Sequence, residues 1–153
     1  MTTISETNNA ELISVLNEEV QALHHMLYPS RFKPYNKNEV APAFKAMLSQ
    51  HNCKAYIAYD DGVPAGYIIF FIKEVSDSPF HYKGSSVYID QLAVLKKHRQ
   101  KGIGKLLLET AGKLAADLSI ADIELDYWNE NKDAALFFER QGFKIVRHIA
   151  RKT

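Results

Sequence analysis

Several residue types and patterns that mark particular protein classes are scarce or absent in this chain of 153 residues. Its single cysteine, Cys53, excludes an internal disulfide and fits a reducing compartment. The longest apolar run, Tyr67 to Ile72, is far shorter than the ~20 residues that a membrane helix needs. The first residues, MTTISETNNAEL, lack the charged and apolar regions of a signal peptide. We therefore expect a cytoplasmic protein that makes no membrane contact.

A strong net charge is also missing, because 19 basic and 18 acidic side chains leave a formal charge of only +1. The protein as a whole has no strongly positive electrostatic potential that would attract nucleic acid, so no nucleic-acid partner is expected. The one local excess is a basic cluster of five lysines and arginines between Lys96 and Lys105. Cys53 has no C-x-x-C partner, and no metal site is expected.

The length and the ordinary composition, 46% hydrophobic and 24% charged, predict one globular domain over residues 1–153. Apolar spacing, turn residues and helix-end signals then predict a mixed α/β fold. The expected order is a strand, two helices, three strands, a helix, a strand, a helix and a final strand. The corresponding ranges are 2–5, 12–27, 38–50, 53–59, 63–73, 86–94, 102–118, 121–127, 131–141 and 143–150, with a hairpin turn at Asp60-Asp61-Gly62.

The basic cluster contains the sequence Arg99-Gln100-Lys101-Gly102-Ile103-Gly104 and is followed by an amphipathic helix. The first amides of a helix lack intrahelical acceptors, and glycines let a ligand approach them closely. These features predict a pyrophosphate-binding turn. A Walker A loop is excluded by Arg99 and Leu106, and a GxGxxG dinucleotide motif by Leu107. Taken alone, the two glycines could also serve only to start the helix.

Two longer patterns carry a family resemblance. From Val94 to Gly104 the chain is similar to V-x4-[RQ]-x-x-G-x-[GA], the acetyl-coenzyme A motif of the GNAT N-acetyltransferase superfamily. From Asn131 to Phe143 it resembles the second signature, N-x-x-A-x-x-F-[YF]-x-x-x-G-F. The resemblance implies the GNAT acyl-CoA N-acyltransferase fold, with a central mixed, mostly antiparallel sheet of 6–7 strands and about four helices. It also implies transfer of an acetyl group from acetyl-CoA to a primary amine.

The resemblance further implies which residues hold the cofactor. Backbone groups of the strand before the motif would pair with the pantetheine arm as another strand does. The amides that follow would bind the pyrophosphate, with Arg99 ordering the turn, and residues of the last helix would flank the cofactor. These positions are Leu92, Ala93, Val94, Arg99, Gln100, Lys101, Gly102, Ile103, Gly104, Lys105, Asn131, Ala134, Phe137 and Arg140. For Phe137, packing in the core is an alternative role.

For catalysis, the resemblance implies direct attack of a neutral amine, which needs a group to take its proton. Asp90 matches the place of a carboxylate in related enzymes, and an ordinary solvated strand residue is the alternative. Strand alternation places Tyr88, Asp90 and Leu92 on one face if no bulge intervenes. Phe138 stands where many members have a tyrosine that protonates the leaving thiolate, so Tyr127 or Tyr82 could substitute.

On the acceptor side, the segment between the first two helices is rich in aromatics and histidines. Tyr28 and Phe32, with Tyr35, are candidates for the walls of a small-molecule or peptide amine site, and His24 or His25 are alternative bases. Phe80, His81 and Tyr82 could close the other wall. Homodimers are frequent in the family, so a homodimer remains open. The alternative function is a catalytically degenerate acyl-CoA-binding sensor or regulatory module.

Overall fold

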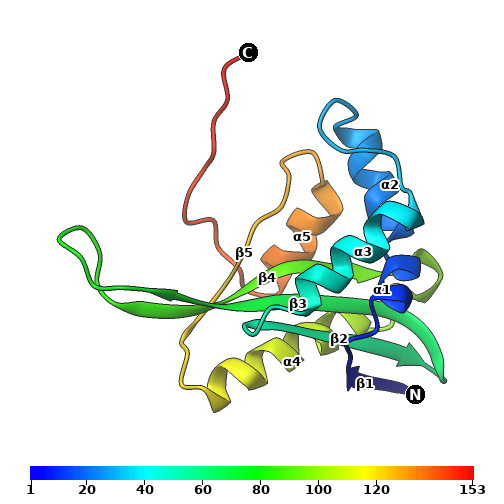
Figure 1. Cartoon of the computed structure of the whole chain (residues 1–153), viewed down its shortest axis with the longest axis horizontal. Helices are drawn as coiled ribbons and strands as arrows, with labels where there is room; N and C mark the ends of the chain where they lie inside the picture. The colour runs from blue at the N-terminus through cyan, green and yellow to red at the C-terminus, as the bar shows by residue number, and fades with distance from the viewer.

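The computed structural model describes residues 1–153 and contains one five-stranded sheet with helices on both faces (Figure 1). The strands follow chain order across the sheet, from β1 to β5. Neighbouring strands are antiparallel except β4 and β5, which are parallel. The strands are β1 (Thr2–Glu6), β2 (Cys53–Asp60), β3 (Val63–Val75), β4 (Gly84–Val94) and β5 (Asp122–Leu125).

Five α-helices flank this sheet. They are α1 (Ala10–Leu16), α2 (Glu18–Leu27), α3 (Lys37–Leu48), α4 (Ile103–Asp117) and α5 (Lys132–Arg140), and a short 3-10 helix spans Lys96–His98. The helix α4 covers one face of the sheet, whereas α1 and α3 cover the other (Figure 1). None of these helices has the length and apolarity needed to cross a membrane.

The strand β3 lies between the two hydrophobic cores of the protein. Successive residues of β3 alternate between the two cores, with Ile68 and Phe70 facing α4 and Tyr67 and Ile69 facing α1 and α3. All four side chains are fully buried. A strand covered on both faces therefore has a continuous apolar sequence and lacks the polar alternation of a half-exposed strand.

The mixed α/β fold is confirmed, but the predicted 6–7 strands and four helices are corrected to five of each. The helix expected over 12–27 is divided at Asn17, which ends α1 and begins α2. The strand expected over 143–150 is absent. A strand needs a neighbour for its backbone hydrogen bonds, and residues 144–153 make none with the rest of the chain. This segment leads away from the sheet, with Ile145, Val146 and Ile149 exposed (Figure 1).

Candidate active site

The turn between β4 and α4 is held by side chains from two directions. Within the turn, Arg99 Nε donates a 2.9 Å hydrogen bond to the carbonyl of Val94 and so closes it on the strand. From β2, the Asp60 carboxylate lies 2.8 Å from His98 Nδ1 and 2.6 Å from Lys101 Nζ. Hydrogen bonds from Lys101 and then His98 lower the pKa of Asp60. These contacts anchor the turn to β4 and β2.

The backbone of this turn presents a row of free amides. Gln100 and Gly102 have positive φ values of 62° and 79°, and Gly102 caps the start of α4. The six amides from Gln100 to Lys105 donate to no acceptor in the chain. Because they lie at the positive end of a helix of 15 residues, they can receive an anion such as a diphosphate.

In the segment of β4 that precedes this turn, β4 and β5 are no longer paired. The parallel pairing of the two strands ends at Ile89 and Leu125, whereas β4 continues to Val94. From residue 90 onward β4 pairs only with β3, so its other backbone edge lacks a strand partner. An extended ligand that carries amide groups can pair with such an edge.

A β-bulge lies where the two strands separate. In the β3–β4 ladder, Ile69 pairs with Gln91 and Phe70 pairs with Ile89, so Asp90 is an extra residue. The expectation that Tyr88, Asp90 and Leu92 share one face is therefore wrong. Leu92 packs with the α4 core, whereas the neighbouring Gln91 contacts Tyr67 in the core under α1 and α3.

A cavity of about 240 Å³ lies beside this bulge. It brings together predicted residues from distant segments: Asp90, Leu92, Tyr127, Asn131, Ala134 and Phe32. The other residues that line it are Asn17, Val20, Gln21, His24, Ile89, Gln91, Leu125, Asp126, Trp128 and Phe138. Of these, Asn17, Gln91, Asp126 and Trp128 were missed by sequence reasoning, because no local pattern distinguishes them from surface or core residues.

The charged groups of the cavity are suited to proton transfer. Desolvation by the surrounding protein raises the pKa of Asp90 although its side chain is exposed, and the charge of Asp126 adds to this, whereas Gln91 and Lys73 lower the pKa. Burial lowers the pKa of His24, which favours its neutral form. Asp126 accepts a 2.5 Å hydrogen bond from the hydroxyl of Tyr88. The cavity therefore holds two candidate bases, Asp90 and His24.

Aromatic rings form the wall of the cavity next to α2. The ring centroid of Phe32 lies 4.9 Å from that of His24 and 5.2 Å from that of Trp128, and all three residues line the cavity. The predicted substrate residue Tyr28 does not line it, and its ring packs against Trp128 with 4.8 Å between the centroids. The Tyr28 hydroxyl accepts a 3.0 Å hydrogen bond from the amide of Glu130, which ties α2 to the segment before α5. Tyr127 stacks on Phe138 at 5.8 Å.

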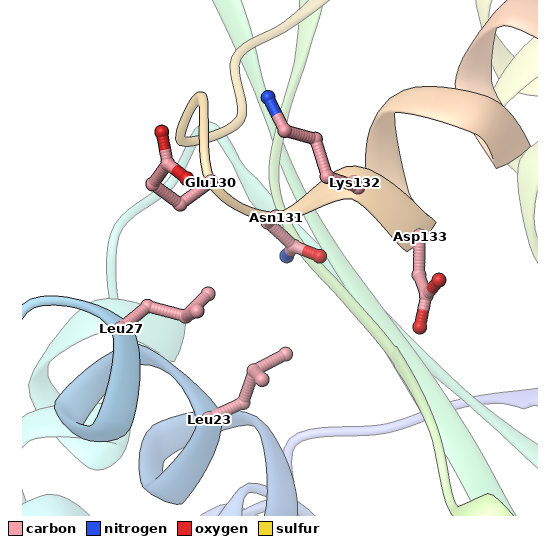
Figure 2. Close-up of a pocket in the computed structure, with 6 residues that line it drawn as sticks. All are labelled: Leu23, Leu27, Glu130, Asn131, Lys132 and Asp133. Carbon is pink, nitrogen blue, oxygen red and sulfur yellow. The ribbon is translucent and has the colours of Figure 1, made fainter.

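A second cavity, of about 190 Å³, lies between α2 and the start of α5 (Figure 2). Leu23 and Leu27 of α2 face Asn131, which also lines the larger cavity. Asn131 caps α5, because its side-chain oxygen accepts a 3.3 Å hydrogen bond from the amide of Ala134. The candidate pantetheine contact is thus held at a helix end between the two cavities.

Other candidate residues lie apart from the larger cavity. Phe80 and Tyr82 are 87% and 94% exposed in the turn between β3 and β4, at the far end of the long hairpin (Figure 1). Tyr35 donates to the carbonyl of Ser14, and His25 Nδ1 lies 2.7 Å from the Phe32 carbonyl. Arg140 is exposed at the end of α5, and neither Tyr35, His25 nor Arg140 lines the cavity.

The chain is similar to known proteins over most of its length. The model of the acetyltransferase (GNAT) family matches residues 20–143. The L-ornithine N5-acetyltransferase NATA1 of Arabidopsis thaliana is 30% identical over 130 residues, which cover 78% of this chain and 55% of that protein. The chain thus spans about half the length of this curated relative.

Solved structures share the fold. A mutant of the BH1408 protein from Bacillus halodurans has a TM-score of 0.93 at 19% identity, and 99% of each chain is covered. The aminoglycoside N-acetyltransferase AAC(6')-Iy in complex with CoA has a TM-score of 0.72 at 18% identity, covering 100% of this chain and 94% of that chain. With a family model that matches most of its length, the chain belongs to the acetyltransferase (GNAT) family.

Proposed function

We propose that this protein transfers the acetyl group of acetyl-CoA to the primary amine of a small molecule. The observation that carries the proposal is the continuity of three features around the end of β4. The free amides of Gln100–Lys105, the unpaired edge of β4 from residue 90 and the cavity at Asp90 follow one another. Together they match a ligand with a diphosphate at one end, amides in the middle and a reactive thioester at the other.

The residues present fit acetyl-CoA at each of these points. The amides from Gln100 to Lys105 would hold the diphosphate, and Lys105 and Arg99 add positive charge. The backbone of Leu92, Ala93 and Val94 would pair with the pantetheine amides, and Asn131 would contact the arm near its acetyl end. When bound, acetyl-CoA supplies an activated acyl group. An amide near Leu92–Val94 would stabilise the negative charge that develops on its carbonyl oxygen.

Asp90 is the proposed general base. An alkylamine is mostly protonated at neutral pH, so it must lose a proton before it can attack. The raised pKa of Asp90 makes its carboxylate a stronger base than an ordinary aspartate. The bulge places Asp90 at the point where β4 leaves β5, next to the start of the proposed cofactor-binding edge.

Tyr127 is the proposed general acid for the departing thiolate. It lines the cavity and stacks on Phe138, which occupies the position of the family's usual tyrosine. The two ring centroids lie 5.8 Å apart, so Tyr127 offers a hydroxyl on the ring next to the one that lacks it. A thiolate is a tolerable leaving group, so this acid assists the reaction without being indispensable.

The acceptor would enter beside Phe32 and Trp128, which line the cavity, with Tyr28 packed against Trp128. Relatives named for ornithine and aminoglycoside acetylation support a small-molecule amine, although they differ in the molecule they modify. A sensor that binds acyl-CoA without turnover is the second candidate, and the missing hydroxyl at Phe138 favours it. Thiol release from acetyl-CoA with a panel of primary amines separates the two, since a pure sensor releases no thiol above background.

A further inference from the structure

Asn17 is a buried polar residue that the proposed mechanism has not used. It lies at the break between α1 and α2, is only 4% exposed and lines the same cavity as Asp90. Only two polar residues of the chain are buried, and the other, Ser14, bonds to the carbonyl of Ala10. The side-chain oxygen of Asn17 has no hydrogen-bond partner. A buried acceptor without a donor is unfavourable and calls for an explanation.

Helix capping does not explain this asparagine. Three other asparagines precede helices, and each uses its side-chain oxygen as a cap: Asn9 toward Leu12, Asn36 toward Asn38 and Asn131 toward Ala134. Asn17 precedes α2 in the same way but makes no such bond. Its oxygen is therefore free for another role.

The orientation of this amide is set by a chain of hydrogen bonds. Asn17 Nδ2 donates to the hydroxyl of Tyr67 at 3.1 Å, and this hydroxyl donates to Gln91 Oε1 at 2.6 Å. Tyr67 is fully buried, so the chain has no competing water at that point. With its NH₂ group committed to Tyr67, Asn17 directs its oxygen away from that hydroxyl. The oxygen has almost no exposed surface, so a donor in the cavity that Asn17 lines reaches it only after a small side-chain movement.

We propose that Asn17 is a positioning residue that accepts one N–H of the acceptor amine and thereby selects primary amines. The inference rests on the proposed function. A neutral primary amine has four directions around nitrogen: its carbon chain, one lone pair and two N–H bonds. The lone pair must point at the thioester carbon, one N–H faces Asp90, and the second N–H is left for Asn17.

In the transfer step the C–N bond forms and the C–S bond breaks, with the electron pair of the C–S bond leaving on sulfur. The proton that faces Asp90 passes to the Asp90 carboxylate, whereas the N–H on Asn17 is retained in the amide product. A secondary amine has only one N–H in its neutral form. It would leave either Asn17 or Asp90 without its donor, and a site built around substrate N–H groups rejects such analogues strongly.

Matched amine pairs test this role: butylamine with N-methylbutylamine, benzylamine with N-methylbenzylamine, and 1,4-diaminobutane with its N,N′-dimethyl derivative. The wild-type protein should favour the primary amine by about 100-fold or more in kcat/KM. Asn17→Leu should lower kcat/KM for the primary amine about 10- to 100-fold and bring the ratio of kcat/KM within each pair toward one. Asn17→Ser, which keeps a hydroxyl acceptor, should retain part of the preference.

Asn38→Leu is the control, because Asn38 is exposed on α3 and its side chain makes no hydrogen bond. Calorimetric titration with coenzyme A verifies that each variant is folded. A wild-type ratio near one, or an unchanged ratio in an Asn17→Leu protein that still binds coenzyme A, would overturn the positioning role alone. If Asn17→Leu does not fold, the ratio of kcat/KM within each amine pair, measured for the wild type and for Asn17→Ser, tests the positioning role instead. No turnover with any primary amine would overturn the proposed function itself.

Discussion

The ring of Phe137 on α5 lies directly against Gly104 in the first turn of α4. A Cβ atom added at Gly104 would come within 2.9 Å of Phe137 Cζ, closer than side chains approach one another. The contact joins the two sequence signatures, one of which supplies the glycine and the other the ring. Phe137 therefore packs against the start of α4, in agreement with the packing role considered for it, and a side chain at Gly104 would require the Phe137 ring to move.

A glutamate at position 104 should abolish coenzyme A binding. Gly104→Glu introduces bulk against Phe137 and negative charge beside the amides that would hold the diphosphate. Like charges at a binding site cost several kcal/mol, so we expect an affinity loss of about 100-fold or more by calorimetry. Gly84→Glu is the control, since Gly84 has open space around it at the start of β4. Equal affinities for the two variants would place the diphosphate elsewhere.

Asp90→Asn should lower kcat by about 100-fold or more while coenzyme A affinity stays nearly constant. The carboxylate acts as a base only when ionised, so wild-type kcat should fall as pH decreases through the pKa of Asp90. Because desolvation and the charge of Asp126 raise that pKa, the fall should begin above the ordinary value of 3.8. The variant should lack this acid limb, and Asp122→Asn on exposed β5 should keep it. A pH profile shared by all three proteins would remove Asp90 from the mechanism.

Tyr127→Phe should reduce kcat by about 10- to 100-fold. This loss is no larger than the smallest losses usual for a general acid, because a thiolate leaves readily without protonation. The neighbouring position offers a rescue: Phe138→Tyr in the Tyr127→Phe background supplies a hydroxyl on the ring that stacks on residue 127. Steady-state thiol release measures both effects. Full activity in Tyr127→Phe, with no gain from Phe138→Tyr, would show that no side-chain acid is needed here.

Ending the chain at Phe143 should change the free energy of unfolding by less than about 1 kcal/mol. Residues 144–153 make no backbone hydrogen bonds with the rest of the chain, and Ile145, Val146 and Ile149 are 65%, 89% and 84% exposed. Urea denaturation of the full-length and shortened proteins, with light scattering on each, is the measurement. A much larger loss would mean that this segment packs in solution, against its own sheet or against a second copy.

The sequence alone determined the features that depend on near neighbours. Apolar periodicity located the helices to within a few residues, apart from the division at Asn17, because each helix forms hydrogen bonds within itself. The hairpin between β2 and β3 followed from Asp60-Asp61-Gly62, where Asp61 and Gly62 both adopt positive φ. The helices expected from Gly102 and from Asn131 begin at these residues, which cap α4 and α5, because a helix start depends on adjacent residues.

Tertiary structure alone decided the features that join distant segments. The extra residue at Asp90 depends on how β4 pairs with β3, and strand register cannot be read from either strand alone. The contact between Asn17 and Tyr67 spans 50 residues, and that between Tyr67 and Gln91 spans 24. The final predicted strand failed for the same reason: alternation makes a segment suitable for a sheet, but only a partner's backbone groups turn it into a strand.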